Sequence, residues 1–378
     1  MSNSTTYNIP TLPLDIDLES KEVLKQLSKA NRQLAELKGI AHAIPNEQIL
    51  ISSLTLQEAR DSSEVENIVT TQDDLYRAGL NLKDSILNAS TKEVLNYREA
   101  IQTGFRLVRD NHLLTNNIIK QIQQTLENNR AGFRTVPGTV LKDNKGNVVY
   151  TPPQDPKEVN RYMDNLEQFI NNPELSDLDP LIKMAIIHHQ MESIHPFYDG
   201  NGRTGRIVLI LYLVITDLLD LPILYLSRYI TRNKGEYYRL IQAIRDTEDN
   251  QELWQEWILF MLKGVEETAC ETIRLVKGIS QLMARYKATL RPLFDKQYKH
   301  EILNNLFFHP YTKIEFLERD LNVSRQTASK YLQMIVDAGL LEKVKIVNSN
   351  YYINTALIDL FMGKQETLEQ VSTIESVG

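Results

Sequence analysis

A glycine-rich run from His195 to Arg206 constrains the fold of this chain more than any other segment. Residues 181–194 and 203–219 on either side of it have the apolar periodicity of helices. The run between them reads HPFYDGNGRTGR and therefore predicts a loop that opens a helix. Because residues 207–221 are apolar on nearly all sides, that helix is expected to be central and buried, and to end at Pro222.

The residue types in this run suit a phosphate-bearing ligand. Glycines let the backbone approach a ligand closely, and N–H groups at a helix start bind anions. Arg203 and Arg206 are one helical step apart, so both can donate to phosphate oxygens. Asp199 offers the hard oxygen that Mg²⁺ shares with phosphates, and His195 can accept a proton near neutral pH. The run thus predicts a nucleotide, a metal and a general base together, against the simpler alternative of a glycine-rich loop with a structural histidine.

The run resembles the signature of the Fic family, H-x-F-x-D/E-G-N-G-R-x-x-R, at every fixed position. The resemblance implies a mainly α-helical bundle with one β-hairpin flap, and transfer of AMP from ATP to a hydroxyl side chain of a target protein or of the enzyme itself. It implies His195 as the base that takes the hydroxyl proton and Asp199 as the Mg²⁺ ligand. The implied ATP-binding residues of the run are Gly200, Asn201, Gly202, Arg203, Thr204, Gly205 and Arg206.

A second motif lies upstream on an expected helix. Ser62 and Glu66 are four residues apart and so share one helix face, although a solvated glutamate is the simpler interpretation. Ser62-x-x-x-Glu66-Asn67 resembles the inhibitory motif of Fic proteins, S/T-x-x-x-E-G/N, in the subclass whose inhibitor precedes the core. A carboxylate at the place of the ATP γ-phosphate would pair with Arg206 and exclude ATP. The same residues also suit the reverse reaction, hydrolytic removal of AMP, with Glu66 orienting water.

Two β-branched runs flank an Asn- and Gly-rich turn and predict a hairpin over residues 134–153. A lone hairpin leaves the backbone groups of its edge unpaired. In its position before the glycine-rich run, this hairpin resembles the flap of Fic proteins, on which an extended segment of the target protein docks. An ordinary structural hairpin is the alternative. Further on, Tyr237 and Tyr238 lie on a helix expected over residues 227–245. Their surroundings loosely resemble the family's adenine-contacting region, with core packing as the alternative.

Residues 299–360 alternate short helices with β-rich runs, which is the pattern of a winged helix-turn-helix domain. Seven basic and six acidic residues lie between 299 and 347. This balance is poor for binding a phosphate backbone. A protein-interaction role is therefore favoured over a regulator that senses nucleotide and binds DNA.

Length and composition set the remaining expectations. The 378 residues allow two or three domains, here a helical region with the inhibitory helix (1–90), a catalytic core (91–295), the winged-helix domain (299–360) and a polar tail (363–378). The net charge of −7 argues against a generic polyanion binder, and the single cysteine excludes an internal disulfide. Without a signal-peptide pattern or a long apolar run, the protein is expected in the cytoplasm and off the membrane. The family resemblance also implies that a homodimer can form.

Overall fold

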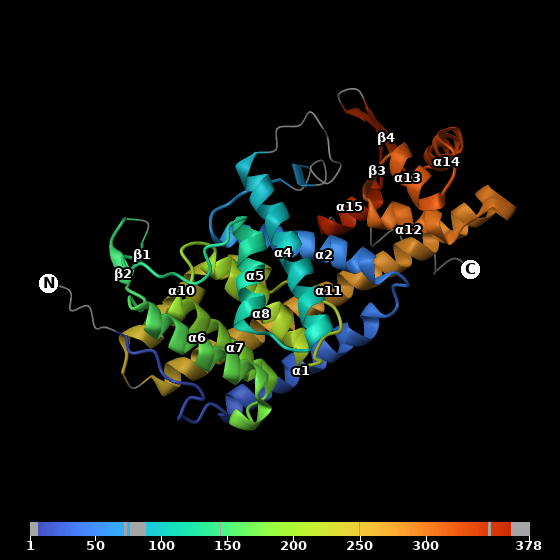
Figure 1. Ribbon diagram of the computed structural model, residues 1–378. Helices are drawn as coiled ribbons and strands as arrows, with labels where there is room; N and C mark the ends of the chain where they lie inside the picture. The colour runs from blue at the N-terminus through green and yellow to red at the C-terminus, as the bar shows by residue number, and fades with distance from the viewer. Residues whose placement is uncertain are drawn as a thin grey trace. The chain divides into compact units, whose positions relative to one another are not determined.

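The computed structural model describes residues 7–71, 74–75, 88–143, 145–248, 250–346 and 349–363. This described part is mainly helical (Figure 1), with one two-stranded and one three-stranded sheet, which confirms the expected fold class. Its contacts divide it into two compact units, one of residues 1–38, 54–70 and 88–270 and one of residues 39–53, 71–87 and 271–378. Apart from Gly363, the expected polar tail lies outside the described residues. Within the described ranges, no helix has the length and apolarity needed to span a bilayer.

The helices of the first unit begin where the sequence supplies capping groups. The side chains of Thr115, Asp155 and Asp179 each accept a hydrogen bond from a first-turn N–H group. Pro156 and Pro180 occupy first-turn positions, where their missing N–H costs nothing. The helices that lie wholly or partly in this unit are α1 (Lys21–Ala41), α2 (Glu47–Val65), α4 (Ala89–Asn111), α5 (Asn116–Glu127), α6 (Pro156–Asn171), α7 (Pro180–Ile194), α8 (Asn201–Ile215), α9 (Leu226–Arg232), α10 (Lys234–Asp246) and α11 (Gln251–Phe294).

Helix α8 is the centre of the first unit. It contacts α4, α5 and α7, and every residue from Arg203 to Leu213 is buried, as the all-round apolar sequence predicted. It ends at Ile215, six residues before the expected end. The reason is that Asp217 takes a left-handed conformation with φ of 59°, and the N–H groups of the next two residues both turn back to Leu213 O.

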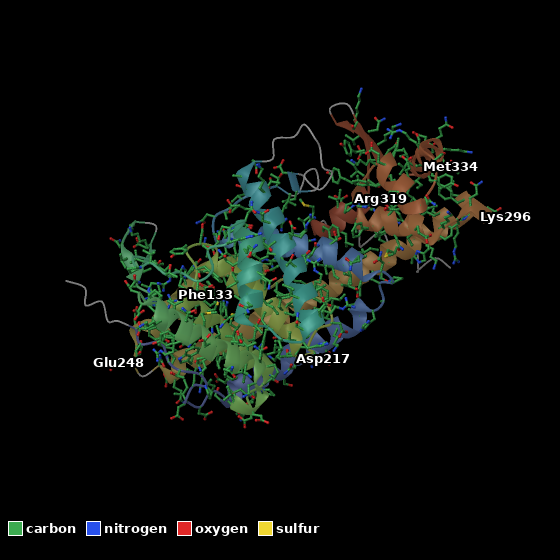
Figure 2. All side chains as sticks on the ribbon, in the orientation of Figure 1. Phe133, Asp217, Glu248, Lys296, Arg319 and Met334 are labelled. Atoms are coloured by element: carbon green, nitrogen blue, oxygen red, sulfur yellow. The ribbon has the colours of Figure 1, made fainter. Side chains whose placement is uncertain are left out.

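Aromatic side chains pack on the elements next to this central helix, among them Phe133, which is labelled in Figure 2. Phe133 packs on Phe197 of the glycine-rich run, with ring centroids 5.3 Å apart. Trp254 and Trp257 of α11 are buried against the adjacent His188 and His189 of α7. The helix expected over residues 227–245 is in fact two helices, α9 and α10, which meet at Asn233.

The predicted hairpin is present but shorter than expected. Strands β1 (Leu141–Lys142) and β2 (Val148–Tyr150) pair antiparallel. Residues 134–140, expected as strand, form none, because the backbone N–H groups of its first residues bond to the glycine-rich run instead. In the turn, the Asp143 carboxylate accepts from the N–H groups of Lys145 and Asn147, which closes the loop. We refer to residues 134–153 as the flap.

The second unit contains the arrangement of a winged helix-turn-helix domain. A sheet in the order β3-β5-β4 packs with the helices, and Ser324 caps α14 after a left-handed turn at Asn322. Arg325 at the start of α14 lies 3.6 Å from Glu315, so part of its charge is offset within the domain. The elements are α12 (His300–Phe308), β3 (Tyr311–Thr312), α13 (Ile314–Leu321), α14 (Arg325–Asp337), β4 (Glu342–Ile346), β5 (Ser349–Ile353) and α15 (Thr355–Phe361).

Candidate functional site

The glycine-rich run forms a tight loop between α7 and α8. His195 ends α7 with φ of 48°, and Gly200 precedes α8 with φ of 74°, so both take left-handed backbone. The Asn201 side chain holds the loop, since its Oδ1 accepts from Phe197 N at 2.8 Å and its Nδ2 donates to Phe197 O at 2.9 Å. Both polar atoms of the Asn201 side chain are therefore engaged within the loop, and its backbone N–H is among the first-turn groups that lack an intrahelical acceptor.

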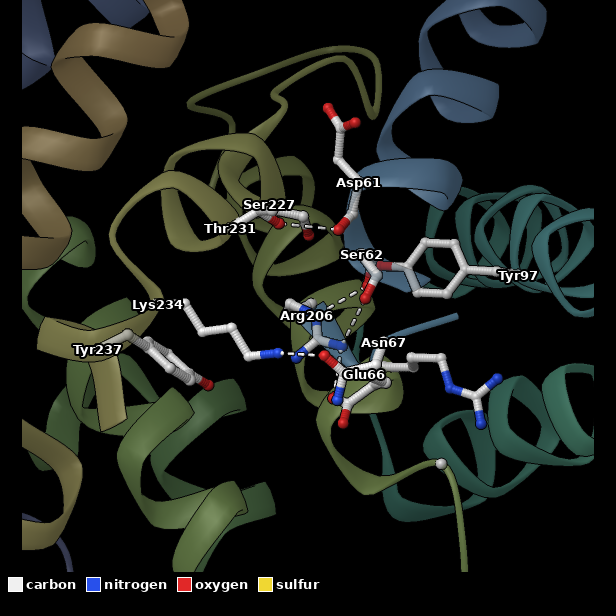
Figure 3. Close-up of polar contacts among 12 residues, drawn as sticks. Asp61, Ser62, Glu66, Asn67, Tyr97, Arg206, Ser227, Thr231, Lys234 and Tyr237 are labelled. Carbon is white, nitrogen blue, oxygen red and sulfur yellow. Dashed lines mark hydrogen bonds and ion pairs between the residues drawn. The ribbon is translucent and has the colours of Figure 1, made fainter. Parts of the chain in front are cut away.

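Arg206 lies buried at the centre of the site and brings the two predicted motifs together (Figure 3). Its Nε donates to Ser62 Oγ at 2.8 Å, and its Nη2 lies 2.8 Å from Glu66 Oε1. Burial alone would raise the pKa of Glu66, but the Arg206 charge and hydrogen bond outweigh it and hold that pKa below its usual range. A Cβ on Gly202 would stand 2.5 Å from the same Glu66 oxygen, so the carboxylate lies directly over the glycine backbone.

Residues that follow and face Glu66 keep α2 in this place. Asn67 ends the helix with φ of 62°, and its Oδ1 accepts from Lys234 Nζ at 3.0 Å (Figure 3). Thr231 of α9 donates from its hydroxyl to Asp61 O at 3.0 Å. The segment from Asp61 to Asn67 is thus held by α9 and α10 as well as by Arg206.

Arg203 is neutralised by two carboxylates that sequence reasoning missed. Its Nη1 lies 3.0 Å from Glu93 Oε2, and its Nη2 lies 2.9 Å from Glu127 Oε1. The Glu127 carboxylate also covers Gly200, where a Cβ would collide with it. Both arginines of the run therefore face carboxylates, and Gly200 and Gly202 each lie under a carboxylate oxygen. Nothing in the sequence around Glu93 or Glu127 signals this pairing, because they come from α4 and α5.

Asp199 stands at the open side of the loop, with 77% of its side chain exposed. Its Oδ1 accepts from Gly200 N at 2.7 Å, and the part of the chain that the structure describes gives its Oδ2 no partner. These described ranges hold no group of three His, Cys, Asp or Glu side chains able to bind a metal ion. A metal at Asp199 would take its other ligands from water or from a bound phosphate.

The surroundings of His195 favour the neutral form of its imidazole. Burial, followed by the charges of Arg245 and Arg134, lowers its pKa to about 4. Arg134, which the sequence did not single out, is 1% exposed, and its Nε donates to His195 O at 2.8 Å. A neutral imidazole can accept a proton, as general-base chemistry requires.

The remaining predicted site residues lie in different surroundings. Tyr237 is buried, with its hydroxyl 2.8 Å from His188 Nε2, which fits the core-packing alternative, whereas Tyr238 is 44% exposed. Thr204 is fully buried within α8. A Cβ on Gly205 would come within 3.2 Å of Glu192 Oε1, so this glycine makes room for a carboxyl whose pKa burial raises to about 7.

A further buried carboxyl, Glu58, joins α2 to its neighbours. It accepts from the backbone N–H of Ser227 at 3.2 Å, from the Ser227 hydroxyl, and from Tyr97 Oη at 3.4 Å. Burial raises its pKa to about 8. Helix α2, which leads to Ser62 and Glu66, is therefore held by a buried carboxyl whose neutral form is favoured.

Glu58→Gln should make the thermal stability of the protein less dependent on pH. In the unfolded chain this carboxyl ionises near pH 4.3, so its contribution to folding is complete below that pH. The contribution is lost as pH rises toward about 8, by up to about 1.4 kcal/mol per pH unit. A glutamine is neutral throughout, so the Tm of the variant should exceed that of the wild type by several degrees at pH 8 and match it near pH 5.

Differential scanning calorimetry across this range measures the effect. Glu64→Gln is the matched control, because Glu64 lies on the same helix and is exposed. A Tm difference between Glu58→Gln and wild type that does not grow from pH 5 to pH 8 would contradict the assignment.

Comparison with known proteins places the chain among related sequences and folds. Residues 24–106 match a family model described as Fic/DOC family N-terminal, residues 113–213 one described as Fic/DOC family, and residues 282–357 the C-terminal domain of SoFic-like protein adenylyltransferases. A protein of Aquifex aeolicus (strain VF5), named a probable protein adenylyltransferase, is 24% identical over 297 residues, which cover 77% of this chain and 82% of that protein.

Two further similarities cover different shares of the chain. The protein adenylyltransferase Fic of Drosophila erecta is 28% identical over 137 residues, which are 32% of this chain and only 28% of that protein. The crystal structure of a Fic family protein from Desulfovibrio desulfuricans G20 superposes with a TM-score of 0.56 at 17% identity, covering 90% of this chain and 98% of that one. This last likeness is one of fold.

Proposed function

Because the chain belongs to the Fic/DOC family, we propose that it is a protein adenylyltransferase, which transfers AMP from ATP to a hydroxyl side chain of a target protein and of itself. One observation carries the proposal: the His195 imidazole, the first-turn N–H groups of α8 and two buried arginines all come from one continuous stretch, which is the loop after α7 and the first two turns of α8. These are the groups that phosphoryl-type transfer needs, since the protein mainly positions the reactants and stabilises charge.

In the proposed reaction, His195 takes the proton of the acceptor hydroxyl. The hydroxyl oxygen then forms a bond to the α-phosphorus. The bond between that phosphorus and the oxygen bridging the α- and β-phosphates breaks, and pyrophosphate leaves with the bonding electrons. The N–H groups that start α8 would hold the phosphate oxygens. Arg206 and Arg203 would offset the charge that develops on pyrophosphate.

Magnesium fits the exposed Asp199 carboxylate, whose Oδ2 has no protein partner in the described ranges. Mg²⁺ prefers one or two carboxylates together with waters and substrate phosphates. When bound, it would neutralise negative charge on the triphosphate. Asp199 would hold it beside the start of α8, since the other oxygen of this carboxylate is already fixed by Gly200 N.

Glu66 would keep the enzyme inactive by taking the place of a substrate phosphate. Its carboxylate engages Arg206 and lies over Gly202, so ATP and Glu66 would compete for the same donors. Glu127 would act in the same direction at Arg203 and Gly200. The arrangement described here is therefore the inhibited form of the proposed enzyme.

The target protein is proposed to dock on the flap as an added strand. The flap presents apolar side chains to solvent: Val136 is 60% exposed, Val148 56% and Val149 44%. A two-stranded sheet leaves unpaired backbone groups at its edges, and an extended segment with apolar side chains would satisfy both features.

The position of the transferred group tests the proposal directly. Purified Glu66→Gly protein is incubated with Mg²⁺ and ATP labelled either at the α- or at the γ-phosphate, and label on protein is counted after denaturing separation. We expect the α-label to remain on the protein and the γ-label to be absent. Retention of the γ-label would indicate a kinase-like reaction and exclude AMP transfer.

A further inference from the structure

Both ends of the flap are hydrogen-bonded to consecutive residues at the end of α7 and the start of the loop that follows it. At its first end, Arg134 donates from Nε to His195 O at 2.8 Å and from Nη2 to Ile194 O at 3.3 Å. At its far end, Tyr150 Oη donates to Ser193 O at 2.8 Å. Three successive carbonyls at the end of α7 are thus taken by two flap side chains. Helix ends leave such carbonyls without intrahelical partners, so they are available for this purpose.

The backbone of the flap is joined to the same loop. Arg134 N donates to Pro196 O at 2.8 Å. The N–H groups of Thr135 and Val136 donate to Tyr198 Oη at 2.8 and 3.2 Å. The first three flap residues therefore follow the loop from residue 194 to residue 198 closely, with His195 in the middle of the contact.

Burial makes the two anchoring side chains rigid. Arg134 is 1% exposed and Tyr150 is 6% exposed. Behind them, the Arg245 guanidinium lies 3.9 Å from the centre of the Tyr150 ring, and its Nε donates to Ser193 Oγ at 3.1 Å. The carbonyl of Ser193 thus accepts a hydrogen bond from the flap, and its hydroxyl accepts one from α10. Cation–π contact and hydrogen bonding of a buried arginine both favour one fixed geometry.

We propose that Arg134 and Tyr150, with Tyr198, are positioning residues that fix the flap relative to His195, so that an acceptor strand docked on the flap delivers its hydroxyl to the imidazole. The inference rests on the proposed function and deepens it. In the described structure, no side-chain hydrogen bond of these three residues reaches the start of α8, Arg206 or the Asp199 carboxylate. Substituting them should therefore slow AMP transfer to the acceptor and leave ATP binding unchanged. The loss can be large, because a displacement of about 1 Å in a reacting group can lower the rate about a hundred-fold.

The experiment separates transfer to protein from transfer to water. Tyr150→Phe and Tyr198→Phe, together and in the Glu66→Gly protein, remove two hydroxyls and keep both rings. The probe acceptor is a size-tagged copy of the full chain carrying His195→Ala. We expect AMP incorporation into this copy to fall at least about ten-fold, while the Kd for ATP by calorimetry stays within two-fold and release of free AMP from ATP is unchanged or higher.

A matched control removes a hydroxyl elsewhere. Tyr162→Phe on α6 leaves a similarly buried ring, and the described structure shows no hydrogen bond from its hydroxyl, so incorporation should not change. Melting temperatures verify that all variants are folded. The inference is overturned if incorporation and AMP release fall together, or if neither changes. If the Glu66→Gly parent incorporates no AMP, the proposed function itself fails, which is a different result.

Arg134 adds an independent readout, because its charge also acts on His195. The charged groups around this imidazole are Arg245 on α10, Arg134 on the flap and Glu66 directly after α2. In Arg134→Gln one positive charge is lost, so the pKa of His195 rises and the acid limb of the pH–rate profile moves to higher pH. Arg134→Lys keeps the charge but not the two-pronged contact, and should lose acceptor transfer without this shift. Identical pH profiles for the two variants would overturn the role given to Arg134.

Discussion

Replacing Glu66 with glycine is expected to raise AMP incorporation about ten- to hundred-fold over the wild type, as measured by mass spectrometry of the intact protein after incubation with ATP and Mg²⁺. The physical reason is competition for Arg206, which is 2% exposed and pairs with Glu66 at 2.8 Å. A charge-assisted hydrogen bond in such a shielded place contributes about 1.5–3 kcal/mol. Its removal frees the arginine and the backbone of Gly202 for phosphate.

The control for this substitution is Glu64→Gly. It places the same flexible residue two residues earlier, at an exposed position in the last turn of α2, so it controls for any loosening of the end of this helix. Incorporation should stay near the wild-type level in this control. If incorporation falls in Glu66→Gly, the inhibitory role is wrong, and removal of AMP with Glu66 orienting water becomes the better account of the site.

Much of the site could be predicted because its parts are close in the sequence. From His195 to Arg206 the chain supplies base, carboxylate, N–H groups and arginines in twelve residues, so a single loop and helix start bring them together whatever the rest of the fold does. The meeting of Ser62 and Glu66 with Arg206 depended on motif resemblance. Helical spacing placed the first two on one face but could not say which arginine they would meet.

The partners of Arg203 and the anchors of the flap could not be predicted. Glu93, Glu127 and Arg134 are single charged residues, and such residues are usually solvated, so their sequence context gives no reason to expect burial. Only the packing of α4, α5 and the flap around the loop makes them partners of that loop. The early end of α8 escaped prediction for a similar reason, since an apolar sequence does not reveal a left-handed residue at Asp217.

Tyr237 shows how one motif can leave two interpretations open. A tyrosine beside an expected nucleotide site suits adenine stacking and core packing equally well on residue type. The structure buries Tyr237 against Trp257 and gives its hydroxyl to His188, while the adjacent Tyr238 remains exposed. The difference depends on which face of α10 is turned toward the protein interior. Two adjacent tyrosines in the sequence do not show which of them lies on that face.

Replacing His195 is expected to lower AMP transfer by about 10²- to 10⁴-fold, the usual contribution of a positioned general base, while ATP still binds. Binding should persist because the proposed phosphate-binding groups are the start of α8 and Arg206, and neither has a hydrogen bond to the imidazole. The substitutions are made in the Glu66→Gly protein. Calorimetry gives the Kd for ATP, and intact-mass spectrometry gives the incorporated AMP.

His195→Ala alone would mix two effects, because His195 has φ of 48° and alanine is strained there. His195→Asn avoids this, since asparagine tolerates left-handed backbone, and His300→Ala controls for loss of an exposed histidine elsewhere. Both His195 variants should lose transfer alike. In the active parent, the acid limb of the pH–rate profile should lie well below the ordinary 6.5, because burial and two arginines lower the pKa of the imidazole to about 4. If the His195→Asn protein transfers AMP at the rate of the parent, His195 is not the general base. The N–H groups at the start of α8 and the arginines would then have to account for the rate.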